Sequence, residues 1–274
     1  VWSAVLLLGG LQTILDSEEG RTREAITDPA APGFEAFVEQ TWSMLVVTED
    51  EAGGLAQVAV VAVADRESGG GTVMLIPPEL VTAGCPTGVC RLDDVYRDGG
   101  VEALHAMVAR RLDVEFTDAT LLTPPRWATL VGPVAPIPVE VEHDLIETGP
   151  DGTTVIRFPA GEALVAADDV VAFMAFPDEG ADQDRLQRQG IIWRSWLAQV
   201  RTGGDTAVNL PGIDLPVVEV AAALAAGPTV VVDSLWSYSG GELVVDPARL
   251  EQRILDMFPF PIPLQPGQRA TVRL

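Results

Sequence analysis

The segment from Asp182 to Gln189, which reads DQDRLQRQ, carries the side chains best suited to hold an anion. Arg185 and Arg188 are three residues apart, so on a helix they share one face near its first turn. A phosphate seated there would meet two guanidinium groups and the N–H groups of the helix end. The alternative is that both arginines pair with carboxylates, which are abundant here. Spacing alone favours the ion pairs.

The charge of the chain limits the partners it can have. The 274 residues include 40 acidic and 17 basic ones, all of the latter arginine, and the net charge is −23. Such a field repels nucleic acid and anionic lipid headgroups, so we expect no nucleic-acid partner. Two His and two Cys exclude a Cys/His zinc framework, and we predict no metal site. With 47% hydrophobic residues the chain is expected to fold around a sizeable core.

The elements that would position these residues alternate between strand and helix patterns. Near-continuous apolar runs predict buried strands at 41–48, 55–64 and 72–76, the last two forming a hairpin. Further strands are expected at 118–122, 137–141, 153–158, 229–232 and 242–245, and helices at 100–112, 126–131, 184–200, 217–226 and 247–258. Asp246 is the expected N-cap of the last helix. This interleaving indicates a layered α/β domain.

The first residues, Val1 to Leu15, are nearly all apolar. Three interpretations compete: the outer end of a truncated membrane anchor, a buried helix, or the remnant of a signal peptide. The stretch from Asp16 to Gly33 that follows is acidic and contains proline and glycine.

Several stretches occur in an order that resembles the LytR-CpsA-Psr family of extracytoplasmic cell-envelope proteins. They read SMLVVTED, LAQVAVVAVADRESGGGTVMLIPPELV, RLDDVYRDGG, LDVEFTDATLLTPPRWATLVGPV and DQDRLQRQ. The last is similar to the family's D-x-x-R-x-x-R-Q motif. The resemblance extends from Thr41 to Val200, with looser agreement onward to Leu274.

The resemblance implies a three-layer α/β/α sandwich with a central mixed sheet, preceded by one membrane helix. We therefore expect a truncated anchor and juxtamembrane segment over 1–40, a LytR-CpsA-Psr-like domain over 41–274, and an extracytoplasmic location. Active members of the family transfer glycopolymers from a polyprenyl-pyrophosphate carrier to the cell wall with magnesium. Their lipid tail occupies an apolar pocket between sheet and helices.

Two residue pairs gain an interpretation from the resemblance. Trp193 and Trp196 share one face of a helix; core packing is the default, and lining the lipid pocket is the alternative. Cys85 and Cys90 could be two free thiols in a loop, but an exported domain favours a disulfide between them.

The sequence departs from the family at the positions that would bind charge. The family's R-x-D-T motif aligns with Leu55 to Val58, so its metal-ligating Asp is Gln57 here. Its P-R-D motif aligns with Pro77, Pro78 and Glu79, and its R-x-R motif with Ala175, Phe176 and Pro177. Two guanidinium groups cannot neutralise a pyrophosphate as several would, and an amide is a weak magnesium ligand.

We therefore predict a non-catalytic domain without a cofactor that binds a polyprenyl-phosphate lipid, a glycopolymer or a protein partner. Asp182, Arg185, Arg188 and Gln189 are its candidate anion-binding residues. The alternative is a magnesium-dependent phosphotransferase, which we would expect if three or more arginines converged on the site. Arg66, Arg91, Arg97 and Arg126 are the candidates for joining Arg185. A structural domain with a filled core is a third possibility.

Overall fold

The fold is taken from a computed structural model that describes residues 36–38, 41–65, 68–85, 88–177, 182–203, 216–239, 242–258 and 270–272. The chain divides into two units, one of Val1–Glu39 with Leu264–Leu274 and one of Gln40–Pro263. In the first unit, β1 (Ala36–Val38) pairs antiparallel with β15 (Ala270–Val272). The predicted anchor, Val1 to Leu15, lies outside the described residues. No helix among the described residues has the length and apolar character needed to cross a membrane.

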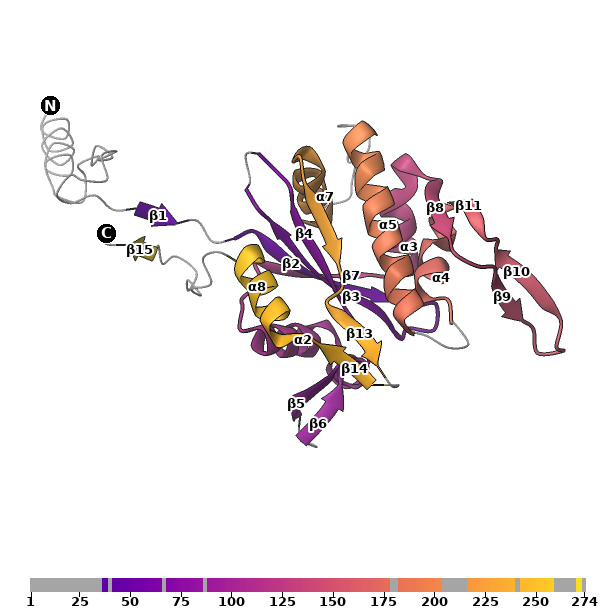
Figure 1. The fold of residues 1–274 in the computed structure, drawn as a ribbon, viewed down its shortest axis with the longest axis horizontal. Helices are drawn as coiled ribbons and strands as arrows, with labels where there is room; N and C mark the ends of the chain where they lie inside the picture. The colour runs from indigo at the N-terminus through magenta and orange to yellow at the C-terminus, as the bar shows by residue number, and fades with distance from the viewer. Residues whose placement is uncertain are drawn as a thin grey trace, which may run out of the picture. The chain divides into compact units, whose positions relative to one another are not determined.

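A five-stranded mixed sheet is the centre of the second unit (Figure 1). Its order is β12 (Val230–Asp233), β4 (Gly71–Ile76), β3 (Leu55–Val63), β2 (Ser43–Glu49) and β7 (Asp118–Leu122). β3 runs antiparallel to both of its neighbours, β2 and β4. At the two sides of the sheet, β7 runs parallel to β2 and β12 runs parallel to β4. The three strands predicted from apolar runs are thus confirmed as members of one sheet.

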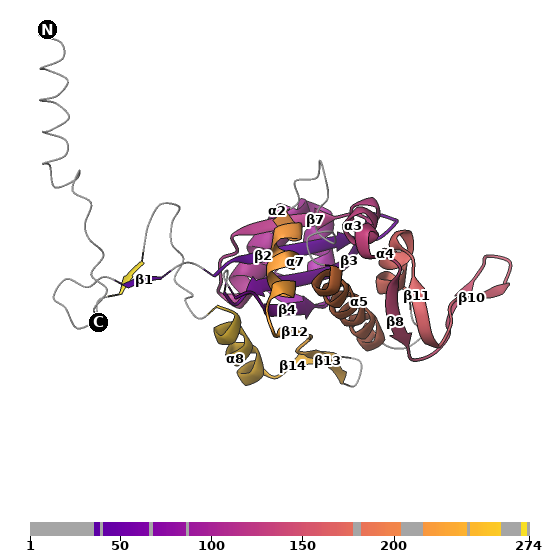
Figure 2. The same cartoon turned by 90° about the horizontal axis from the view of Figure 1, so that it is seen from above.

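Helices cover both faces of this sheet. One face carries α3 (Pro124–Val131), α4 (Val170–Ala175), α5 (Asp182–Gly203) and α7 (Pro216–Ala226), and the other carries α2 (Leu92–Leu112) and α8 (Pro247–Met257) (Figures 1 and 2). Alternate residues of each strand feed the two cores: Val46 packs on the α5 side, and Val47 on the α2 side. The predicted three-layer α/β/α sandwich with a central mixed sheet is confirmed.

The helix ends follow local chemistry. The Asp246 carboxylate accepts hydrogen bonds from the N–H groups of Ala248 (3.0 Å) and Arg249 (3.4 Å), which confirms it as the N-cap of α8. α2 begins at Leu92, eight residues before the predicted start at Gly100. Gly100 itself is non-helical, with φ 65° and ψ −159°, so α2 consists of two helical segments joined at a kink, and the second is the helix predicted from about Gly100 to Leu112.

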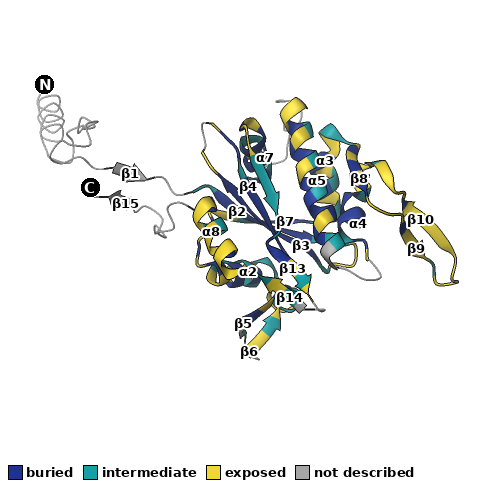
Figure 3. Cartoon of the chain, in the orientation of Figure 1, coloured by how far each residue is buried: buried dark blue, intermediate teal, exposed yellow. Residues whose placement is uncertain are grey.

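A long β-hairpin over residues 137–165, which we call the arm, projects from the sandwich (Figure 1). β8 (Ile137–Val141) pairs with β11 (Gly161–Val165), and β9 (Leu145–Thr148) pairs with β10 (Thr154–Phe158). The strands predicted at 137–141 and 153–158 are present, but each has a partner that the sequence patterns did not reveal. Much of β9 and β10 is exposed (Figure 3).

The described part of this unit also contains two further hairpins and two short 3-10 helices. They are β5 (Val81–Cys85) with β6 (Gly88–Arg91), β13 (Trp236–Ser239) with β14 (Glu242–Val245), and η1 (Gly132–Val134) and η2 (Ala167–Asp169).

Candidate functional site

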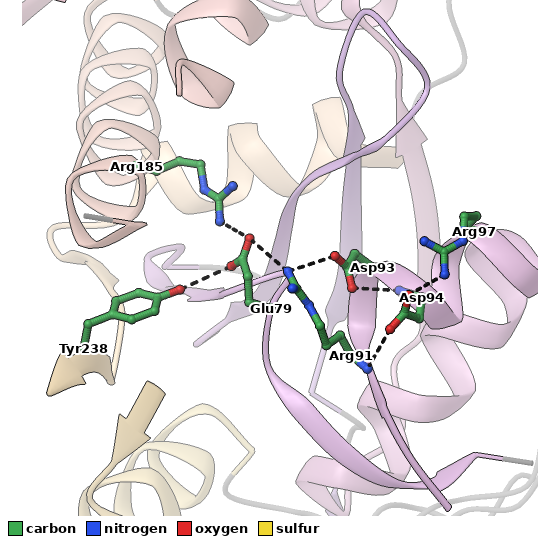
Figure 4. A network of polar contacts seen from close by, with 7 residues as sticks. All are labelled: Glu79, Arg91, Asp93, Asp94, Arg97, Arg185 and Tyr238. Atoms are coloured by element: carbon green, nitrogen blue, oxygen red, sulfur yellow. Dashed lines mark hydrogen bonds and ion pairs between the residues drawn. The ribbon is translucent and has the colours of Figure 1, made fainter. Parts of the chain in front are cut away.

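A carboxylate lies between two guanidinium groups at the edge of the sheet where β4 ends and α5 begins (Figure 4). Glu79 follows β4 directly after Pro77-Pro78, and it accepts a hydrogen bond from Arg185 in the first turn of α5. The Arg91 guanidinium approaches the same oxygen at 3.8 Å, and the Tyr238 hydroxyl donates to the other at 3.4 Å. Glu79 and Arg185 are only 18% and 19% exposed. The site therefore has a neutralised, half-buried centre.

Further along α2, the charges pair among themselves. Arg91 also contacts Asp93 at 3.0 Å, and Arg97 forms an ion pair with Asp94. The side-chain hydrogen bond from Arg97, followed by the backbone N–H of Arg91, lowers the pKa of Asp94 below its usual range. Each arginine in this part of the site thus faces a carboxylate.

Of the four arginines considered as companions of Arg185, one reaches the same carboxylate. Arg91 does so, whereas Arg97 pairs with Asp94, and Arg126 donates to the carbonyl of Leu121 at 2.8 Å. Arg66 lies outside the described residues. Among the described residues, two guanidinium groups therefore approach Glu79.

Arg188 has a different role from Arg185, although the two are one turn apart. Arg188 is 5% exposed, and its guanidinium donates to the carbonyls of Phe173 (3.2 Å) and Phe176 (2.5 Å). These are carbonyls at the C-terminal end of α4, which have no partner within that helix. Arg188 therefore ties α4 to α5, and joint binding of an anion by the two arginines stays a prediction.

A buried polar network takes up the position where the resemblance expects a metal-ligating carboxylate. Gln57 is fully buried, and its Oε1 accepts from Trp193 Nε1 at 3.1 Å and from the Thr48 hydroxyl at 3.4 Å. The Thr48 Oγ1 accepts in turn from Trp127 Nε1 at 2.9 Å. Gln189 is also fully buried and donates to the carbonyl of Ala56 at 3.0 Å. These amides hold α5 against β3.

Trp193 and Trp196 lie in the core between the sheet and α5, each 1% exposed. Their rings meet each other and Trp127 edge to face, with centroids 5.4 to 5.8 Å apart. Neither lines the cavities described below, so a lipid beside them would have to displace packed side chains. Lining of a lipid pocket by this pair stays a prediction.

Two cavities border the arm. One of 760 Å³ is lined by the turn after β2, by β9, by Arg157 of β10 and by α4 with the two residues after it. One of 340 Å³ lies between α5 and the arm and is lined in part by Asp184, Arg188 and Glu142. The larger cavity contains Ala175 and Pro177, where the resemblance expects arginines.

Cys85 and Cys90 form a disulfide that closes the β5–β6 hairpin, as predicted. Their Cα atoms are 6.1 Å apart. Because the hairpin lies between Glu79 and Arg91 in the chain, the bond restrains the connection between these two residues.

The donor set does not fit magnesium. The Gln57 amide is engaged with Trp193, and the Glu79 carboxylate is engaged with Arg185 and Arg91. Magnesium prefers free carboxylates in octahedral geometry. Among the described residues no group of three His, Cys, Asp or Glu side chains could hold a metal ion.

Comparison with known proteins identifies the fold. No family model matches the sequence, and no curated protein does. TagV from B. subtilis is similar in structure, with a TM-score of 0.60, 17% identity, and coverage of 80% of this chain and 96% of TagV. TagT bound to LIIa-WTA has a TM-score of 0.63 at 15% identity, over 86% of this chain and 94% of TagT. The LytR-CPS2A-psr family protein YwtF (TagT), with bound octaprenyl pyrophosphate lipid, has a TM-score of 0.58 at 14% identity, over 86% and 92%.

The chain has the LytR-CpsA-Psr fold. At these identities the likeness establishes the fold alone, and the chemistry must be read from this chain's own side chains. Within the LytR-CpsA-Psr fold, those side chains form a neutralised ion cluster at Glu79 and a closed amide network at Gln57.

The sequence pattern indicates the burial of Gln189, but it does not indicate the contact between Tyr238 and Glu79. Gln189 precedes Trp193 by four residues and Trp196 by seven, so its place on the buried face of α5 follows from helical spacing. The approach of Tyr238 to Glu79 spans 159 residues and could not be inferred. The structure places Asp182 at the first residue of α5.

Proposed function

We propose that this chain is a non-catalytic cell-envelope domain of the LytR-CpsA-Psr type that binds a polyprenyl-phosphate lipid, a glycopolymer or a protein partner. The observation that carries the proposal is the side chain of Gln57. It is fully buried and bonded to Trp193, at the position where the family's active members have a metal-ligating carboxylate. An amide held in the core cannot bring magnesium to a pyrophosphate.

The charge distribution supports the same conclusion. Phosphoryl transfer depends on positive charge placed around the transferring group. Here the guanidinium groups of Arg185 and Arg91 face Glu79, and the guanidinium group of Arg188 donates hydrogen bonds to carbonyls at the C-terminal end of α4. The binding part of the proposal draws on the similar structures, in which octaprenyl pyrophosphate is bound to YwtF (TagT) and LIIa-WTA to TagT.

The second candidate is a phosphotransferase that attaches glycopolymers from a polyprenyl-pyrophosphate carrier to the cell wall. One observation favours it: Glu79, Arg91, Arg185 and Tyr238 converge at one edge of the sheet (Figure 4). A ligand that displaced Glu79 from Arg185 would face two guanidinium groups.

An assay with a polyprenyl-pyrophosphate glycan donor, an acceptor and magnesium separates the two. We expect no product above the background of the heat-denatured chain, while an active enzyme of the family turns over under the same conditions. Turnover that Arg185→Ala abolishes would refute the proposal. Native mass spectrometry of the purified chain should detect a co-purified polyprenyl lipid if lipid is the ligand.

We also propose that the domain is extracytoplasmic and held at the membrane by an N-terminal helix. The Cys85–Cys90 disulfide supports this, because such bonds persist in oxidising compartments. The test is membrane fractionation of the natural full-length protein, followed by protease treatment of intact cells. Recovery in the soluble cytoplasmic fraction would contradict it.

A further inference from the structure

The larger cavity beside α4 combines an apolar wall with an acidic rim. Its volume is 760 Å³, within the range that binding sites occupy. Its apolar lining comes from Val171, Ala172, Ala175, Phe176 and Pro177 in and just after α4, and from Ile146 of the arm. Ile146 is 51% exposed, which is high for a large apolar side chain. The cavity therefore offers apolar surface that a ligand can cover.

The acidic rim consists of lining carboxylates that no basic side chain neutralises in the described part of the chain, Asp50, Glu51 and Glu147. Asp50 and Glu51 come from the turn after β2, and Glu147 comes from β9. Asp50 accepts from the backbone N–H groups of Ala52 and Gly54, at 2.8 and 2.7 Å. The side-chain carboxylates of Glu51 and Glu147 form no hydrogen bond or ion pair with the described part of the chain.

The cation in the lining is already paired. Arg157 contacts Asp169 at 2.5 Å, so its charge is largely cancelled. The lining residues together with Asp169 have four carboxylates and one guanidinium group. The chain as a whole adds a net charge of −23 to the field at this cavity. A phosphate or a second copy of the chain would be repelled, and a cation would be attracted.

The neighbouring strands offer backbone groups as well. β9 and β10 form a two-stranded sheet, so within the described residues each has one edge without a strand partner. Free edges of this kind accept an added peptide strand. A small cation would use the rim alone, whereas an extended peptide would use the rim, the apolar wall and an edge.

From these features we propose that the cavity binds a basic segment of a protein partner. Lysine or arginine side chains of the segment pair with Glu51 and Glu147, and an apolar side chain between them packs against Ile146 and Phe176. The inference rests on the proposed function and narrows its partner to a protein. At the positions of Ala175 and Pro177 the resemblance expects arginines and therefore an anionic ligand. The ligand proposed here is cationic instead.

The test uses synthetic peptides labelled with fluorescein, and binding is followed by fluorescence anisotropy at low salt. A peptide of alternating lysine and valine should bind, and one of alternating glutamate and valine should not. Glu51→Gln combined with Glu147→Gln should weaken binding of the lysine peptide about tenfold, because two ion pairs are lost. Ile146→Ser should weaken it several-fold, with the charges unchanged.

The matched control is Glu102→Gln combined with Glu251→Gln, which makes the same charge change on exposed positions of α2 and α8. Its affinity should stay within about twofold of the unchanged chain. Equal weakening in both double variants would show attraction by net charge alone and overturn the proposal. The proposal would also be overturned if a peptide of alternating lysine and serine bound as tightly as the lysine–valine peptide, or if no lysine peptide bound.

The outcome is separable from the test of the proposed function. Catalytic turnover with the lipid-linked donor would refute the proposal that the domain is non-catalytic. It would not decide peptide binding, which the Glu51, Glu147 and Ile146 variants test separately. Binding of a polyprenyl phosphate together with failure of every lysine peptide would retain the proposed function and refute this inference.

Discussion

The Glu79 carboxylate and the Arg185 guanidinium form an ion pair that joins the end of β4 to the first turn of α5. Glu79 thereby neutralises a guanidinium group where the resemblance expects a site for a pyrophosphate. Both side chains are about one-fifth exposed, so the interaction is screened less than a surface pair would be. Glu79 is therefore the carboxylate that offsets the positive charge of Arg185, and in part that of Arg91, at the end of β4.

Replacing Glu79 by glutamine should convert this edge into a better anion site. Glu79→Gln removes one negative charge between Arg185 and Arg91, and we expect inorganic pyrophosphate to bind about five- to tenfold more tightly at low salt. Isothermal titration calorimetry measures the change. Asp98→Asn is the matched control, since Asp98 is a 79% exposed carboxylate elsewhere on α2. Equal gains in both variants would refute a local effect at Arg185.

The two arginines of the DQDRLQRQ segment should differ in their contribution to stability. Arg188→Met leaves the carbonyls of Phe173 and Phe176 buried without their donor, so we expect a loss of about 2–4 kcal/mol in the free energy of unfolding. Arg185→Met should cost less, about 1 kcal/mol, because Glu79 keeps its contacts with Arg91 and Tyr238 when Arg185 is removed. Urea denaturation of both variants measures the difference. Equal losses would argue against the capping role of Arg188.

The sequence predicted the sheet well because its central strands are buried on both faces. Val58 to Val63 form an apolar run that leaves no alternative to a core strand, and the same holds for Val73 to Ile76. The arm was harder to predict. β9 and β10 are largely exposed, so no hydrophobic alternation fixed their partners.

The site could be predicted only in part, because it depends on distant contacts. Spacing placed Arg185 and Arg188 on one helix, but the C-terminal end of α4 decides the partners of Arg188. The substitution of the expected Asp by Gln57 was visible in the sequence. Its bond to Trp193, across 136 residues, was not.

Restoring a carboxylate at residue 57 should harm the protein. Gln57 is fully buried, so Gln57→Glu places a charge in the core, and we expect a loss of about 2–5 kcal/mol in the free energy of unfolding. Gln57→Met should cost about 1–3 kcal/mol through the hydrogen bonds lost from Trp193 and Thr48. Thermal melts with and without millimolar magnesium are the measurement. A magnesium-dependent recovery of Gln57→Glu would show a metal site that this structure does not support.

The Cys85–Cys90 disulfide should make a modest contribution to stability. It closes a loop with a sequence separation of 5, and loops this short gain on the order of 2 kcal/mol from a cross-link. We expect Cys85→Ser combined with Cys90→Ser to lower the free energy of unfolding by up to that amount. Equilibrium denaturation in the absence of reductant measures it. Reduction of the unchanged chain should give the same midpoint as the double variant, and a much larger loss on reduction would show that the hairpin anchors more of the fold.

Tyr96 should make stability fall at alkaline pH. Burial, followed by the hydrogen bond to Glu49, raises the pKa of Tyr96 above its usual range. Because the pKa in the folded state exceeds that of the unfolded chain, the contribution is fully present below about pH 10 and declines above it, by about 1.4 kcal/mol per pH unit. Tyr96→Phe should lack this decline, which urea denaturation from pH 8 to 11 would reveal as about 1 kcal/mol near the upper limit. The chain has two tyrosines, so the ultraviolet titration of Tyr238→Phe reports Tyr96 alone. An ordinary midpoint near pH 10 in that variant would mean that Tyr96 is open to solvent and does not hold its proton against Glu49.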